Sequence, residues 1–209
     1  FVTRAVRTFA YGLLAVVLAL FLAARGLSDR EIGLVFTLTL AGDAVLSLGI
    51  AGVADRFGRR RLLIASSALI VLAGIAFALT RSTIWLTIAA IIGTISPSGA
   101  EVGPFLAIEQ AAISHGVEAP DRTRVFGHYQ LMGSLSNALG ALTGGWLARS
   151  LASHGYAELD AYRGVLFLYA ALGLVMAALF FRLSPAIEPR ERERARIGGA
   201  VELHCRQLF

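Results

Sequence analysis

The chain has 209 residues, of which 56% are hydrophobic and 16% charged, and this composition is too apolar for an ordinary soluble domain of that length. Its net charge of +5 comes entirely from arginine, and the arginines lie between apolar runs, which argues against a basic surface for nucleic acid. A single cysteine, Cys205, leaves no disulfide framework and no thiolate metal site within one chain. We therefore expect an all-α membrane protein without a metal or cofactor.

Six apolar runs approach the roughly 20 residues that an α-helix needs to cross the hydrocarbon core of a membrane. Irregular backbone cannot face lipid, so these runs are expected to be six transmembrane helices in one bundle, with the connections at the surfaces. The runs cover Thr8–Ala24, Ile32–Ala54, Leu62–Leu79, a fourth that starts at Ile84, His128–Ala148 and Gly164–Phe181. The expected division is a six-helix domain over 1–183 and a charged tail over 184–209 that contains "PRERERARIGG" and is predicted to be disordered.

The arginines predict the orientation of the bundle. Nine lie in connections on the side of the N-terminus and five on the opposite side, which favours a cytoplasmic N-terminus, and six spans then return the C-terminus to the cytoplasm. The nine are Arg4, Arg7, Arg56, Arg59, Arg60, Arg61, Arg122, Arg124 and Arg182; the five are Arg25, Arg30, Arg81, Arg149 and Arg163. The bias toward Arg, Ala, Leu and Gly suggests a GC-rich genome, so the expected location is the plasma membrane of a bacterium.

Asp43 is an acid in the middle of the second apolar run. It lies eleven residues into the run, which at 1.5 Å per residue places it about 17 Å deep, close to the midplane. A carboxylate at that depth is costly and is by default a proton or substrate site that faces the interior of the bundle. A structural hydrogen bond to a neighbouring helix is the rival interpretation.

The connection between the second and third runs reads "GVADRFGRRR", with five charged residues in ten positions. With "GD" at Gly42 and Asp43 before it, this segment resembles the loop between helices two and three of the major facilitator superfamily (MFS). The signature of that loop is Gly, three residues, Asp, Arg, any residue, Gly and two or three basic residues. Its matches here are Asp55, Arg56, Gly58, Arg59 and Arg60, followed by Arg61, while its leading glycine falls on Ala51.

The resemblance implies that this loop is a conformational lock. In the family, its aspartate engages a helix of the other half in the outward-open state, and its basic residues pair with nearby carboxylates. The ordinary excess of positive charge on the cytoplasmic side explains the arginines, but it does not explain Asp55 and Gly58 at that spacing.

The resemblance also implies a function: a secondary active transporter of a small solute that works by alternating access between two six-helix halves, each built from three-plus-three helix repeats. Only one half is present, so the chain is expected to be an N-terminal half or a truncated chain. Its second half would be a missing C-terminal domain or another chain, and proton coupling stays open. A non-transporting membrane scaffold or partner subunit is the alternative. An enzyme is not expected, because no metal-binding group of carboxylates and no intramembrane Ser–His pair stands out.

The fourth run is irregular. Ile84 to Ile95 spans only about 18 Å, so the helix is expected to continue through "SPSGAEVGPF", where Pro and Gly residues should break or kink it. Interrupted spans point to substrate sites in transporters, which predicts that Ser96, Ser98 and Glu101 line the cytoplasmic half of a cavity, with Glu109 at its mouth. A plain proline kink with Glu101 reaching the interface is the alternative.

The fifth run contains glycines at the spacing of closely packed helices. Gly140 and Gly144 form a small-xxx-small face, and with Gly145 they resemble the antiporter motif of the family on helix five. Ala141 stands where that motif has proline, so helix packing is the better interpretation of all three glycines. Asn137 is placed among the cavity residues, although an interhelical hydrogen bond is the commoner role for such a residue.

Overall fold

A computed structural model describes residues 2–57, 59–80, 82–92, 110 and 121–182. Within these ranges the chain forms six helices and no strand, so the all-helical prediction is confirmed for the part described. The helices are α1 (Val2–Ala24), α2 (Asp29–Phe57), α3 (Arg59–Leu79), α4 (Thr83–Ile92), α6 (Arg122–Ser153) and α7 (Glu158–Phe181). The first three expected spans and the last two each lie inside one helix, while the fourth is described only as far as Ile92.

Among the residues that the structure describes, three segments are long and apolar enough to cross a membrane: α1, residues Arg61–Leu79 of α3, and α7. The segment in α1 is the most enclosed of the three. In its apolar stretch 61% is buried by the rest of the protein, against 44% in α3 and 39% in α7. This difference identifies α1 as the central helix of the bundle.

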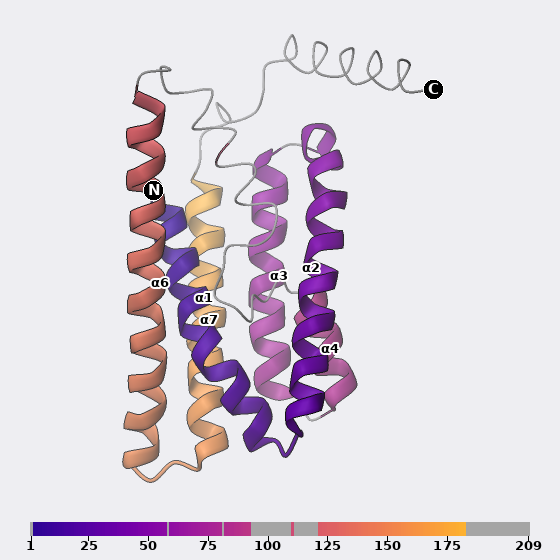
Figure 1. The fold of residues 1–209 in the computed structure, drawn as a ribbon, viewed down its shortest axis with the longest axis vertical. Helices are drawn as coiled ribbons and strands as arrows, with labels where there is room; N and C mark the ends of the chain where they lie inside the picture. Colours follow the sequence, from indigo (N-terminus) through magenta and orange to yellow (C-terminus); the bar gives the residue numbers. More distant parts are fainter. Residues whose placement is uncertain (1, 58, 81, 93–109, 111–120, 183–209) are drawn as a thin grey trace.

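The helices run side by side, with α1 crossing the bundle at a slant (Figure 1). Helix α1 packs mainly against α6 and also against α7, α3 packs against α7 and α4, and α2 packs mainly against α4. The core lies between α1, α3 and α7, where Phe21 and Phe77 meet as tilted rings with centroids 6.4 Å apart. Close packing of this kind holds helices together in lipid, where burial of apolar surface adds little.

Three glycines allow α1 and α6 to approach closely. A Cβ at Gly140 would overlap the carbonyl oxygen of Phe9, and a Cβ at Gly144 would lie 2.6 Å from the carbonyl oxygen of Leu13. From the other side, a Cβ at Gly12 would overlap the backbone of Asn137. The two backbones therefore touch directly along this stretch.

Two turns at one end of the bundle are built in the same way (Figure 1). Gly26 after α1 and Gly155 after α6 have φ angles of +84° and +90°, which glycine adopts without strain. In the first turn, the N–H groups of Gly26 and Leu27 donate to the carbonyls of Ala23 and Leu22, at 2.8 and 3.3 Å. In the turn after α6, the N–H groups of Gly155 and Tyr156 donate to the carbonyls of Ala152 and Leu151 in the same way, at 3.1 and 3.3 Å. Both turns are Schellman motifs, which satisfy the last carbonyls of a helix.

Helix α2 begins with a capping box. The hydroxyl and the backbone N–H of Ser28 both donate to the carboxylate of Glu31 at 2.8 Å, and the N–H of Glu31 approaches the Ser28 hydroxyl at 3.4 Å. The hydrogen bonds from the Ser28 N–H and hydroxyl lower the pKa of Glu31 below its usual value of 4.5. The start of α2 is thus stabilised by contacts within four residues.

Candidate functional site

An acid and two phenols lie buried inside the bundle. Asp43 of α2 is 2% exposed, and Tyr11 of α1 and Tyr169 of α7 are fully buried. Tyr11 and Asp43 both lie close enough to Tyr169 to act on its hydroxyl electrostatically. Helices α1, α2 and α7 thus each contribute one buried polar side chain to the same region of the bundle.

One oxygen of the acid and the hydroxyl of one phenol lack a hydrogen bond within the described ranges. Oδ1 of Asp43 and the hydroxyl of Tyr169 have no hydrogen-bond partner among the residues that the structure describes. An unpaired carboxylate inside a protein is costly, and such groups usually mark a site that binds a proton or another ligand. We define these three residues, Asp43, Tyr11 and Tyr169, as the central polar cluster.

Nearby buried hydroxyl groups behave differently, because they bond within their own helices. Thr8 donates to the carbonyl of Arg4 at 2.9 Å, Thr39 to that of Val35 at 2.7 Å and Ser67 to that of Leu63 at 2.9 Å. These bonds satisfy the hydroxyls locally and need no neighbour. Oδ1 of Asp43 and the hydroxyl of Tyr169 therefore differ from these three hydroxyls.

Two arginines are buried at the beginning of α1, although the sequence placed them among the interfacial charges that set the orientation. Arg4 is 2% exposed and Arg7 1%. The guanidinium of Arg4 lies 3.6 Å above the ring of Tyr129 and donates to Oε1 of Gln130 at 2.9 Å. Gly133 of α6 provides the space, since a Cβ there would lie 2.5 Å from Nε of Arg4.

A pattern in the sequence could have revealed this polar face. Arg4, Arg7, Thr8 and Tyr11 follow one another at intervals of three, one and three residues, which places them on one face of a helix. All four are buried. The polar face of α1 therefore runs from its first turn to the central polar cluster.

The remaining predicted cavity residues are only partly described. Ser96, Ser98, Glu101 and Glu109 lie outside the described residues. Asn137 lies where α6 meets α1, beside Gly12. The structure thus groups Asp43 with two tyrosines that the sequence did not single out, and places Asn137 in a contact between helices.

The predicted lock loop is a very short connection. Helix α2 ends at Phe57 and α3 begins at Arg59, so Asp55, Arg56, Arg59 and Arg60 belong to the facing ends of two helices. Gly58 and the side chains of residues 46–60 lie outside the described part of the structure. Arg61, which follows, is exposed.

The packing glycines of α6 lie at the contact with α1. Gly140 and Gly144 are buried against the backbone of α1, whereas a Cβ at Gly145 would meet only Cγ1 of Val16 at 3.9 Å, an ordinary contact distance. The first two glycines therefore set the separation of the helices, and the third does not.

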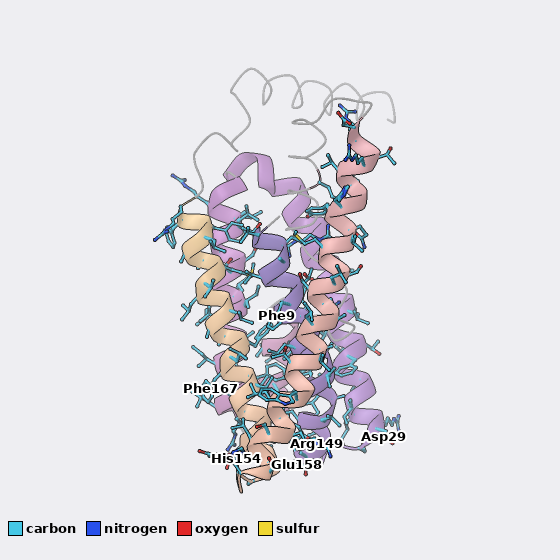
Figure 2. All side chains as sticks on the ribbon, turned by 90° about the vertical axis from the view of Figure 1, so that its left-hand side faces the viewer. Phe9, Asp29, Arg149, His154, Glu158 and Phe167 are labelled. Carbon is cyan, nitrogen blue, oxygen red and sulfur yellow. The ribbon has the colours of Figure 1, made fainter. Side chains whose placement is uncertain are left out.

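Charged residues gather at the end of the bundle that holds the two Schellman turns. Figure 2 shows Asp29, Arg149, His154 and Glu158 at this end. His154 accepts or donates a 2.7 Å hydrogen bond between Nδ1 and the carbonyl of Ser150, and Arg163 donates to Asp160 at 2.8 Å. These contacts lie at the surface and span three or four residues.

Comparison with known proteins gives two matches. The chain matches the family model "Major Facilitator Superfamily" over residues 1–207. It is 38% identical over 184 residues to a Saccharomyces cerevisiae protein described as "Uncharacterized membrane protein YJR124C". That alignment covers 87% of the chain and 41% of the relative, so the chain spans about two fifths of the relative's length. Together with its apolar helices and the "ADRFGRRR" connection, these matches show a membrane protein that belongs to the Major Facilitator Superfamily.

Proposed function

We propose that the chain is the N-terminal six-helix half of a secondary active transporter, which moves a small solute by alternating access against a second six-helix bundle. The observation that carries the proposal is the buried carboxylate of Asp43, whose Oδ1 has no hydrogen-bond partner among the described residues. Family membership supports transport. The greater length of the yeast relative supports a second bundle.

Asp43 is the proposed proton or solute site. Inside a bundle, a carboxylate is stabilised by taking up a proton or by holding a cationic or hydrogen-bonding group. The Tyr169 hydroxyl has no hydrogen-bond partner among the described residues, so it is proposed to donate to a bound solute. Ser96, Ser98, Glu101 and Asn137 are kept as proposed neighbours of the solute path.

The connection from Asp55 to Arg61 is the proposed cytoplasmic lock. The ends of α2 and α3 meet there with a single residue between them, so both helices would move with the lock. The acid would bind the second bundle when the cytoplasmic side is closed. The arginines would pair with carboxylates nearby.

The proposed topology has six spans over residues 1–183, both termini in the cytoplasm, and a tail over 184–209, in the plasma membrane. Single cysteines at Arg61 and Ser82, in a background with Cys205→Ser, test it, because both positions are exposed and lie at opposite ends of α3. A membrane-impermeant maleimide should label Ser82→Cys in intact cells, and Arg61→Cys only after permeabilisation. Labelling of both positions from the same side would exclude the topology.

Transport is tested in vesicles that contain a pH-sensitive dye. The chain is reconstituted alone and together with the part of the yeast relative that the alignment leaves uncovered. A sugar, an organic acid, a dipeptide and a lipophilic cation are then added one at a time. We expect one solute class to move protons in the two-bundle sample, and Asp43→Asn to abolish this movement because it removes the ionisable group.

The control is Asp29→Asn, which makes the same chemical change at an exposed position of the same helix. It should leave the flux unchanged. If the wild type and Asp43→Asn showed equal flux, Asp43 would not be the proton or solute site. The absence of flux of any solute in every sample, with folded protein, would favour the membrane scaffold.

A further inference from the structure

A pocket of about 440 Å³ lies where α1, α6 and α7 meet, next to the α6–α7 turn. Its volume falls within the roughly 300–1,000 Å³ of typical ligand clefts. Much of its wall consists of Gly145, Ala148 and Ala152 of α6 and Ala161 of α7. The space thus exists because four neighbouring positions carry at most a methyl group. No residue of the central polar cluster lines the pocket, and the proposed transport function does not use it.

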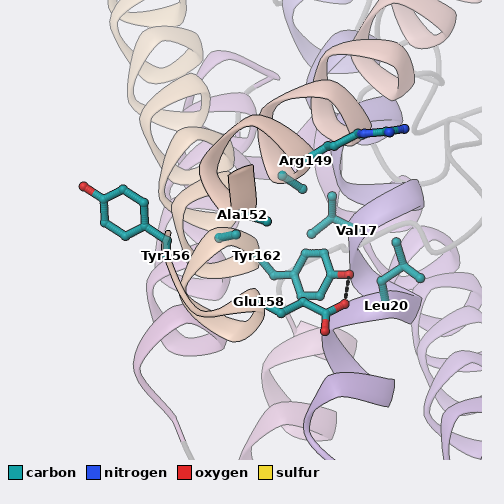
Figure 3. Close-up of a pocket in the computed structure, with 10 residues that line it drawn as sticks. Val17, Leu20, Arg149, Ala152, Tyr156, Glu158 and Tyr162 are labelled. Atoms are coloured by element: carbon teal, nitrogen blue, oxygen red, sulfur yellow. Dashed lines mark hydrogen bonds between the residues drawn. The ribbon is translucent and has the colours of Figure 1, made fainter. Parts of the chain in front are cut away.

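The pocket offers a cation and an anion together. Arg149 lines it, and its guanidinium makes no hydrogen bond or ion pair with any residue in the described part of the chain. Glu158 lines it as well, and its carboxylate accepts a 2.8 Å hydrogen bond from the hydroxyl of Tyr162. Figure 3 shows Arg149 on one side of the pocket and the Glu158–Tyr162 pair on the other. At the same end of the bundle Arg163 pairs with Asp160 at 2.8 Å. The guanidinium of Arg149 has no such partner among the described residues and can bind an anion.

The surroundings of the pocket match the boundary between lipid and water. Arg149 lies four residues before the end of α6, about 6 Å along the helix axis. Leu20 and Tyr156 line the pocket and are 47% and 60% exposed, and Trp146, which follows the lining residue Gly145 in the sequence, is exposed as well. Tryptophan and tyrosine side chains concentrate at the level of lipid headgroups. The pocket thus combines two charged side chains with exposed apolar and aromatic ones, the combination expected at headgroup depth.

We propose that this pocket binds the headgroup of an ethanolamine phospholipid, with the phosphate on Arg149, the ammonium on Glu158 and an acyl chain along Leu20. A guanidinium binds phosphate through two parallel hydrogen bonds, and a primary ammonium donates directly to a carboxylate. A choline headgroup has no N–H to donate. A glycerol headgroup would bring a net negative charge to Glu158 without a compensating cation.

The test is native mass spectrometry of the purified chain with equal amounts of phosphatidylethanolamine, phosphatidylcholine and phosphatidylglycerol. Phosphatidylethanolamine should be retained in preference to both others. Arg149→Gln should lower its retention by at least about tenfold, because the loss of even one of the two charge-assisted hydrogen bonds weakens binding by that factor. Glu158→Gln should remove the preference over phosphatidylglycerol. Ala152→Leu should block binding by filling the pocket.

Arg163→Gln is the matched control, because it removes an arginine at the same end that does not line the pocket. Equal losses in Arg149→Gln and Arg163→Gln, or equal retention of the three lipids, would overturn the proposal. Competition by glycerophosphoethanolamine at the same concentration would assign the pocket to a soluble zwitterion instead of a lipid. Ala152 is exposed, so its leucine variant tests the pocket even if Glu158→Gln does not fold. None of these outcomes bears on the transport proposal.

Discussion

The two ends of the bundle hold their charged residues in opposite ways. Where α1 begins, Arg4 is buried and reaches across to Gln130, a residue 126 positions away in the sequence. At the other end, the contacts of Glu31 and Asp160 are exposed and span three residues. Two contacts at that end are partly buried instead: Arg25 donates at 2.6 Å to the carbonyl of Thr80, and Glu158 accepts at 2.8 Å from Tyr162. Only the first of these joins distant parts of the chain.

This difference indicates which parts of the molecule depend on one another. The first end depends on α1 and α6 being in the correct relative position, so a change in one helix should be felt in the other. The second end is built mainly from bonds within single turns, so its elements should tolerate changes elsewhere. Substitutions at the first end should therefore change stability more, and affect more distant residues, than substitutions at the second end.

The largest effect is expected at the contact that holds α1 against α6. Gly140→Ala should lower the free energy of unfolding by about 2–3 kcal/mol, because the new methyl group overlaps the carbonyl of Phe9. Gly127→Ala in the same helix meets nothing within 4 Å and should raise stability by about 0.5–1 kcal/mol through helix propensity. Unfolding in detergent measures both, and equal effects would contradict the close approach.

The next effect concerns the buried cation. Tyr129→Leu removes the ring under the Arg4 guanidinium and should cost about 1–2 kcal/mol, because the charge stays buried with fewer partners. Tyr156→Leu changes an exposed tyrosine at the other end and should stay within about 0.5 kcal/mol of the wild type. Thermal melting of the two variants compares the ends directly. A neutral Tyr129→Leu would mean that the ring does not stabilise Arg4.

A smaller effect is expected from the long-range bond at the other end. Arg25→Gln shortens the side chain and removes its charge, so the hydrogen bond to Thr80 should be lost at a cost of about 1 kcal/mol. Hydrogen exchange should then accelerate in the α3–α4 turn, although the substitution lies after α1. Arg30→Gln, at an exposed position of α2, should change neither quantity.

The smallest effect is a pH dependence at the start of α2. Because the folded state lowers the pKa of Glu31, its carboxylate adds stability above the ordinary value of 4.5, and this contribution is lost as the pH falls through the lowered pKa. Glu31→Gln should therefore melt slightly earlier than the wild type at neutral pH and converge with it in acid. Asp29→Asn, in the same turn, provides the comparison. A constant difference at every pH would exclude the charge as the cause.

The helices themselves could largely be predicted from hydrophobicity. The first and last expected spans end at Ala24 and Phe181, where the helices also end. Their starts were placed six residues too late, because an apolar run stops at a charge, whereas a helix can continue through one. In α1 this added turn contains Arg4 and Arg7, which are buried instead of marking the surface.

The central polar cluster could be predicted only in part. Asp43 stands out in a sequence because an acid is rare in an apolar run. Tyr11 and Tyr169 do not, because tyrosine is common in membrane helices and their meeting depends on the packing of α1, α2 and α7. For Asn137 the sequence predicted a cavity residue because the side chain is polar. The structure places it against Gly12 of α1, a contact that depends on how the two helices pack.

The close contacts of Gly140 and Gly144 with the backbone of α1 also restrict how this protein can move. A slide of α6 along α1 by even one residue would bring a side chain with a Cβ against the backbone of Phe9 or Leu13. The two helices are thus fixed in register and should travel as a rigid pair in any rocking cycle. Spin labels on α1 and α6 should report a constant separation whether or not a solute is present.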